Sequence, residues 1–107
     1  KTVLYENLIS TCYLQAAGEE RFSDEDYLLV RIQAYFEPTK SISKKKREEM
    51  LQGMILPAKK PDIDNIVKSV LDALNQVAYR DDTQVVELHV RKQYSDRPRV
   101  EVCIEKI

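Results

Sequence analysis

Apolar residues recur along the chain with two different spacings, which separate helical segments from strands. Segments 2–17 and 64–76 place apolar residues three and four positions apart, which predicts two amphipathic helices. Segments 27–36 and 83–93 alternate between two faces and are rich in β-branched or aromatic residues, and 100–104 repeats the alternation. We therefore expect two amphipathic helices and three strands.

Residues that end or cap regular structure refine this assignment. Gly18 ends the first helix, and Pro38 ends the first strand. Ser41 or Ser43 is expected to cap a short charged helix over 44–51.

The connection between the last two strands is rich in turn-forming residues, which predicts that these strands pair as a hairpin; it reads Tyr94-Ser95-Asp96-Arg97-Pro98. The resulting order is helix–strand–helix–helix–strand–strand. It predicts an α/β fold in which helices pack against a small mixed sheet.

Length and composition indicate one folded domain over 1–107. The chain has 107 residues, of which 43% are hydrophobic and 33% charged. It begins at Lys1 rather than methionine, so we expect the domain to be incomplete at its N-terminus. No apolar run reaches the roughly 20 residues of a membrane span, and no membrane partner is expected. Cys12 and Cys103 lie among apolar neighbours and form no metal-binding motif, which favours buried thiols and a cytoplasmic location.

Charge is unevenly distributed although its net value is −1. The segment 40–60 holds seven basic residues against two acidic ones, and 91–99 holds a second basic group. A local basic patch attracts a phosphate backbone more than net charge does. The candidate DNA contacts are Lys44, Lys45, Lys46, Arg47, Lys59 and Lys60. The run 44–47 is also compatible with a solvated helix face.

Four aspartates flank the central helix. Pro61 precedes Asp62 and Asp64, which fall at the helix start, where free N–H groups and the macrodipole favour ionised carboxylates. Asp81 and Asp82 follow the helix. Grouped carboxylates are ligands for Mg²⁺, and Mg²⁺ assists phosphodiester cleavage, so the cluster suggests a nuclease. Capping and turn formation are the structural alternatives. A calcium-binding EF-hand is excluded because the sixth position carries no glycine.

A polar stripe marks one side of the central helix and contains Asp64, Lys68, Asp72 and Asn75. Lys68 lies one turn after Asp64. It either forms an i,i+4 ion pair with Asp64 or stabilises charge that develops on a phosphate.

The motif Pro61-Asp62-Ile63-Asp64-Asn65, followed by Lys68, Asp72, Leu74-Asn75 and Asp81-Asp82-x-Gln84, resembles the signature of the RusA-type Holliday-junction resolvases. The resemblance is dense over 60–92. It implies that Asp62, Asp64 and Asp82 bind the metal, that Asp81 supports them, and that Lys68 is the catalytic lysine. It also implies a small α/β homodimer that acts in DNA recombination and repair. This homodimer would cut four-way DNA junctions in the presence of Mg²⁺ or Mn²⁺. The family usually begins with a strand carrying glycine, proline and basic residues that help to bind DNA. The sequence from Lys1 onward does not contain this strand, so it is either absent from the protein or not included in the sequence.

Two functions follow from the sequence. The first is a metal-dependent endonuclease that resolves four-way junctions. The second is a non-catalytic nucleic-acid-binding or assembly module whose aspartates only cap helices and carry surface charge. Saturable binding of a divalent cation would separate the two.

Overall fold

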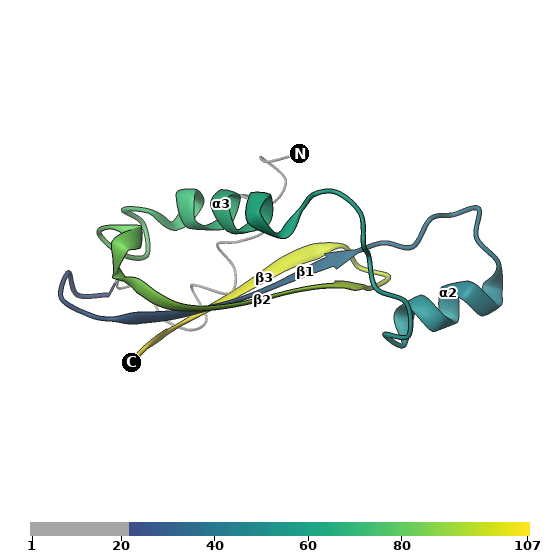
Figure 1. Cartoon of the computed structure of the whole chain (residues 1–107), viewed down its shortest axis with the longest axis horizontal. Helices are drawn as coiled ribbons and strands as arrows, with labels where there is room; N and C mark the ends of the chain where they lie inside the picture. The colour runs from purple at the N-terminus through teal and green to yellow at the C-terminus, as the bar shows by residue number, and fades with distance from the viewer. Residues whose placement is uncertain (1–21) are drawn as a thin grey trace.

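A three-stranded mixed sheet carries one long helix on one face, as the computed structural model shows for residues 22–107 (Figure 1). The elements are β1 (Leu28–Phe36), α2 (Lys44–Leu51), α3 (Ile63–Leu74), the 3₁₀ turn η1 (Asp82–Gln84), β2 (Val85–Tyr94) and β3 (Arg99–Lys106). This is the α/β fold with a small mixed sheet that the sequence predicts. The helix expected over 2–17, together with Cys12, lies outside the described residues.

Strand β1 occupies the centre of the sheet, in the order β2-β1-β3. It runs parallel to β2 and antiparallel to β3. The predicted hairpin between the last two strands is therefore wrong, because β1 lies between them. Leu28, Leu29 and Val30 are all buried, so the start of β1 is covered on both faces. Strands β2 and β3 pair with its two edges. The turn after β2 passes the end of β1, where the Ser95 amide donates to the Phe36 carbonyl at 2.9 Å.

Helix α3 and one face of the sheet form the core. Ile66, Val70 and Leu74 follow the helical period and are at most 2% exposed. They pack on alternate residues of the two neighbouring strands: Leu28, Val30, Ile32, Val100, Val102 and Ile104. Burying each such side chain contributes about 1.5–3 kcal/mol. The core therefore fixes the direction of α3 across the sheet.

Strand β2 is an outer strand and is more exposed than its alternation predicts. Val86 is 59% exposed and Leu88 39%, whereas Val90 is half-buried. The pairing steps from Leu28↔Val85 to Leu29↔Glu87, so Val86 is skipped in the register. Alternation along the strand predicted that Val86 would be buried. The irregular register explains why it is exposed instead.

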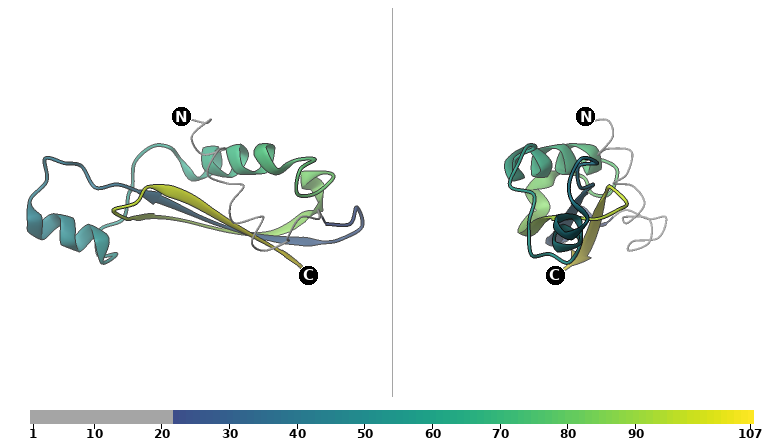
Figure 2. Two further views of the ribbon diagram at one scale, coloured as in Figure 1. Left: turned by 180° about the vertical axis from the view of Figure 1, so that it is seen from behind. Right: turned by 90° about the vertical axis from the view of Figure 1, so that its right-hand side faces the viewer.

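Helix α2 extends beyond the end of the sheet (Figure 2). Its bounds are as predicted, and Ser43 caps it, because the Ser43 hydroxyl accepts from the Lys46 amide at 3.3 Å. Gly53 follows with a φ of 85°, a left-handed conformation that suits glycine. None of the residues of α2 is buried, so α2 only touches the sheet at β2, and of the two described helices α3 alone contributes to the core. None of the helices in 22–107 is long and apolar enough to cross a bilayer.

Candidate functional site

Two of the predicted metal ligands lie at the start of α3. Asp62 occupies the N-cap position, but its side chain makes no capping hydrogen bond, and Asp64 lies in the first turn. Both side chains are exposed. The positive end of the helix dipole attracts their negative charge, and their oxygens remain available to a ligand.

The other two predicted ligands lie at the far end of α3 (Figure 1). Asp81 and Asp82 begin η1, after the chain has turned back from the end of the helix. A helix of 12 residues is about 18 Å long. Within one chain the two acidic pairs are therefore separated rather than gathered. Residues 22–107 contain no group of three or more acidic, histidine or cysteine side chains placed to hold a metal ion.

Asp72 of α3 adds a third negative charge near the acidic pair at η1. Partial burial, the hydrogen bond to Asp81 and the charges of Asp81 and Asp72 raise the pKa of Asp82 above its ordinary value of 3.8. A hydrogen bond from the Thr83 side chain lowers the pKa of Asp81. Asp82 is therefore the carboxyl that gives up its proton less readily, and a cation nearby would favour its ionised form.

Gln84 holds η1 in place from both sides. Its side-chain carbonyl accepts from the amides of Arg80 and Asp81 at 3.1 and 3.2 Å. Its side-chain amide donates to the carbonyls of Ser23 and Asp26 at 2.9 and 3.1 Å. The sequence motif contained Gln84, but gave it no role. The structure assigns it the positioning of Asp81 and Asp82.

Tyr79 supports the same region from inside the core. The side chain is fully buried, and its hydroxyl donates to the Leu71 carbonyl at 3.2 Å. Burial, followed by the charges of Asp82 and Asp72, raises the pKa of Tyr79 far above its ordinary value. Sequence reasoning did not single out this residue.

Lys68 is exposed on α3, and within residues 22–107 its ammonium forms no ion pair. The i,i+4 bridge to Asp64 is therefore not formed. Asn75 departs from the predicted exposed stripe, because it is half-buried at the C-cap of α3. Its Oδ1 atom is buried and meets no donor in this part of the chain.

The predicted DNA contacts divide between two places. Lys44, Lys45 and Lys46 are exposed on α2, and Arg47 beside them is half-buried. Lys59 and Lys60 are exposed on the segment that leads into α3. Both places lie at the end of the molecule where α3 begins (Figure 1).

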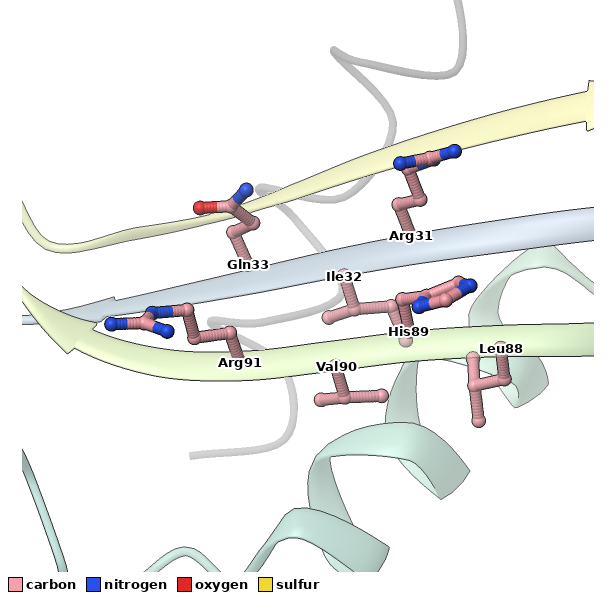
Figure 3. Close-up of a pocket in the computed structure, with 7 residues that line it drawn as sticks. All are labelled: Arg31, Ile32, Gln33, Leu88, His89, Val90 and Arg91. Carbon is pink, nitrogen blue, oxygen red and sulfur yellow. The ribbon is translucent and has the colours of Figure 1, made fainter.

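The sheet face opposite α3 carries a shallow polar groove of about 460 Å³ (Figure 3). Its lining residues are Arg31, Ile32, Gln33, Leu88, His89, Val90 and Arg91. Arg31 is 3.6 Å from Glu105, and His89 is 3.0 Å from Glu87, so both are partnered. None of the predicted aspartates lines this groove.

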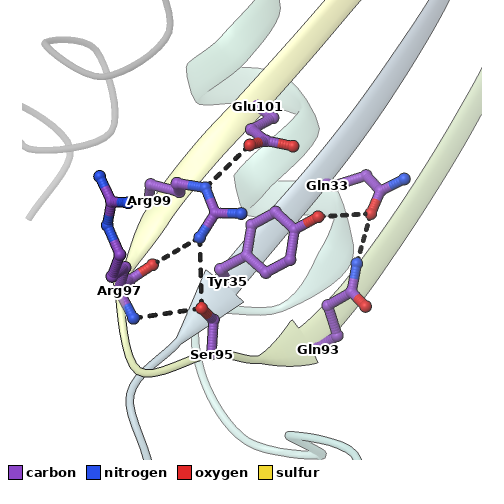
Figure 4. Close-up of polar contacts among 7 residues, drawn as sticks. All are labelled: Gln33, Tyr35, Gln93, Ser95, Arg97, Arg99 and Glu101. Carbon is purple, nitrogen blue, oxygen red and sulfur yellow. Dashed lines mark hydrogen bonds and ion pairs between the residues drawn. The ribbon is translucent and has the colours of Figure 1, made fainter. Parts of the chain in front are cut away.

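A second polar cluster on that face centres on Arg99 (Figure 4). Its guanidinium lies 3.8 Å from the ring centroid of Tyr35 and donates to Glu101 at 2.8 Å. It also donates to the Ser95 hydroxyl at 3.2 Å. The charge of Arg99 is thus already neutralised within the chain, and the cluster stabilises the end of the sheet.

Comparison with known proteins places these features in a family context. The profile of a family described as Endodeoxyribonuclease RusA matches residues 1–105. Over 67 residues the chain is 55% identical to an uncharacterized protein, YqaN, of Bacillus subtilis (strain 168). That match covers 63% of this chain and 47% of YqaN, so the chain spans about half the length of this relative. No solved structure matches the chain.

Proposed function

Because this chain belongs to the RusA endodeoxyribonuclease family, we propose that it is a divalent-metal-dependent nuclease that cuts four-way DNA junctions. The observation that carries the proposal is the pair of acidic sites at the two ends of α3, next to exposed lysines at one end. Carboxylates supply the ligands that Mg²⁺ or Mn²⁺ prefers, and lysines supply attraction for the phosphate backbone.

A metal site built from Asp62, Asp64 and Asp82 does not fit a single chain, because the first two lie at the start of a helix about 18 Å long and Asp82 follows its other end. It fits a two-fold dimer. A two-fold axis across α3 reverses the helix in the second copy, so that the start of one α3 lies beside the end of the other. Asp62 and Asp64 would then face the partner subunit's Asp82, and each dimer would hold two such sites. A four-way junction offers two symmetry-related strands, which matches that number.

Exposed apolar side chains support such a contact. Ile63 is 43% exposed at the start of α3, and Val77 is 57% exposed just beyond its end. Large apolar side chains beside both acidic pairs gain stability when a second copy covers them. The same contact would assemble the metal ligands.

Each residue then has a defined role. A Mg²⁺ ion bound by the acidic residues would supply a Lewis acid for the scissile phosphate and a water molecule of lowered pKa. Asp62, Asp64 and Asp82 would hold the ion, and Asp81 next to Asp82 would add negative charge that attracts it. Lys68 has no ion-pair partner within residues 22–107, so its charge is available to the phosphate on which negative charge develops. The basic residues of α2 and Lys60 attract the arms of the junction.

The deciding experiment compares cleavage of a synthetic four-way junction with cleavage of a linear duplex, using the full-length protein with Mg²⁺ or Mn²⁺. We expect paired cuts in the junction and little cutting of the duplex. Folded full-length protein that leaves the junction intact would overturn the proposal.

Mixing two inactive variants tests the shared site. Asp64→Asn and Asp82→Asn should each be inactive alone. A mixed dimer would hold one site with both wild-type aspartates if the ligands come from two subunits, so the mixture should nick one strand. A site contained in one chain would leave the mixture inactive.

A further inference from the structure

Two lysines gather on a pair of aromatic rings where α3 begins. Phe36 ends β1, and its register partner Tyr94 ends β2. The Lys59 ammonium lies 5.9 Å from the Phe36 ring centroid and 5.5 Å from that of Tyr94. The Lys92 ammonium lies 5.5 Å from the Phe36 centroid and donates to the Lys59 carbonyl. We call these four residues the lysine–aromatic cluster.

The cluster lies on the same sheet face as α3. Lys92 pairs in register with Ala34, and Phe36 is the next residue of the same face; Ala34 belongs to the core beneath the helix. Lys59 precedes Asp62 by three residues, so the cluster lies beside the first acidic pair. The contacts of Lys59 with Phe36, Tyr94 and Lys92 also attach the segment before α3 to the sheet.

The two ammonium groups are not neutralised by the chain. Neither lysine forms an ion pair within 22–107, whereas Arg31, Arg80, Arg99 and Lys106 all do. Contact with a ring stabilises an exposed cation by about 0.5–1 kcal/mol but leaves its charge in place. Two cations on one ring also repel each other. An anion that accepts from both would remove this repulsion.

We propose that Lys59 and Lys92 form a phosphate-binding pair that holds the DNA backbone beside the first acidic pair; this rests on the proposed nuclease function. The ligand is a backbone phosphodiester. The rings hold the two side chains in place, which reduces the entropy lost when the ammonium groups bind one phosphate. Helix α2, with its exposed lysines, lies at the same end of the molecule as the start of α3 (Figure 2), so it would attract DNA towards the pair and the first acidic pair.

Binding to a linear duplex without metal tests the pair independently of cleavage. Lys59→Gln and Lys92→Gln should each weaken binding of the full-length protein about 3–10-fold. In Lys59→Gln/Lys92→Gln the slope of log affinity against log salt should fall by about 0.9, because one phosphate is no longer neutralised. Lys106→Gln is the matched control, because Lys106 is 3.5 Å from Asp26 at the opposite end of the sheet. It should leave the slope unchanged. Lys92→Arg should keep the slope, because it keeps the charge.

A methylphosphonate walk then locates the phosphate that the pair binds. Replacing one phosphate at a time near the cut should weaken wild-type binding at one position, and this effect should disappear in Lys59→Gln/Lys92→Gln. An unchanged salt slope in the folded double variant would overturn the pair, even if the protein cuts junctions normally. Variants that lose self-association but keep their salt slope would also overturn it, because the lysines would then bind a second copy. If duplex binding depends on the pair but junctions are not cut, the proposed function alone fails.

Discussion

The side-chain amide of Gln84 donates a 2.9 Å hydrogen bond to the carbonyl of Ser23, which lies 61 residues earlier in the chain. The other end of the same side chain accepts from the Asp81 amide. One residue therefore joins the loop before β1 to the turn that carries the second acidic pair. The turn that carries Asp82 is therefore connected to a segment far away in the sequence.

Replacing Gln84 with methionine should lower the free energy of unfolding by about 1–3 kcal/mol, because the variant cannot form these hydrogen bonds and leaves backbone groups without partners. Chemical denaturation measures this. Gln52→Met, at the exposed C-cap of α2, is the matched control and should stay within about 0.5 kcal/mol of wild type. If Gln84→Met were as stable as wild type, water would satisfy the turn equally well.

Asp64→Asn should abolish cutting and leave junction binding intact. Asparagine keeps the size of the side chain but removes one negative charge from the proposed metal site. Binding is measured by fluorescence anisotropy and cutting by strand cleavage with Mg²⁺. The control is Asp96→Asn, an exposed aspartate in the turn after β2. Wild-type cutting by Asp64→Asn would mean that Asp64 is not a ligand.

Local sequence signals predicted the local structure well. Apolar spacing predicted α3 and a buried face of Ile66, Val67, Val70, Leu71 and Leu74, of which Val67 and Leu71 are only partly buried. Ser41 or Ser43 was expected to cap α2, and Ser43 does. The predicted hairpin was wrong because a turn sequence shows that the chain reverses, but not that β1 lies between the two strands. The exposure of Val86 depends on a register irregularity that alternation cannot reveal.

The arrangement of the aspartates was only half predictable. The motif placed Asp62 and Asp64 at the start of a helix and Asp82 after it, as the structure has them. That helix is about 18 Å long, so its two ends already kept the acidic pairs apart, which a search for clustered carboxylates overlooks. The hydrogen bonds of Gln84 to Ser23 and Asp26 join distant segments, and no local pattern predicts them.

Tyr79→Phe should lower the free energy of unfolding by about 0.5–1.5 kcal/mol, because the Leu71 carbonyl loses its hydroxyl donor inside the core. Burial raises the pKa of Tyr79, so the folded protein keeps this proton at pH values where an unfolded tyrosine loses it. The corresponding stability is complete below the ordinary value of 10.0 and is lost as the pH rises above it. Wild type should therefore lose more stability than the variant above about pH 10.

Thermal melting at several pH values measures this difference, and absorbance of ionised tyrosine provides a second measurement. In this absorbance titration, the tyrosine that ionises at the highest pH in wild type should be missing in Tyr79→Phe. Tyr27→Phe, at a side chain that is 66% exposed, should leave that ionisation unchanged. If the two variants titrated alike, the Tyr79 hydroxyl would be reached by solvent.

Asp82→Asn should raise the melting temperature of the metal-free protein by a few degrees at neutral pH while abolishing cleavage. The pKa of Asp82 is raised first by its partial burial and then by Asp81 and Asp72, so its charged form is disfavoured in the folded state. A raised pKa of an acid contributes stability below the ordinary value of 3.8, and this stability is lost as the pH rises through the folded-state value. At neutral pH wild type carries this unfavourable charge and the variant does not.

The advantage of Asp82→Asn should therefore shrink as the pH falls towards about 3, where wild-type Asp82 becomes protonated. Adding Mg²⁺ should reverse the order at neutral pH, because an ion that binds the folded protein stabilises it in proportion to its occupancy, and wild type has one more ligand. Melting curves with and without Mg²⁺ at pH 3, 5 and 7 test both effects. If the metal-free variant melts below wild type at pH 7, the Asp82 carboxylate serves η1 as a hydrogen-bond acceptor, and its assignment as a metal ligand has to be withdrawn.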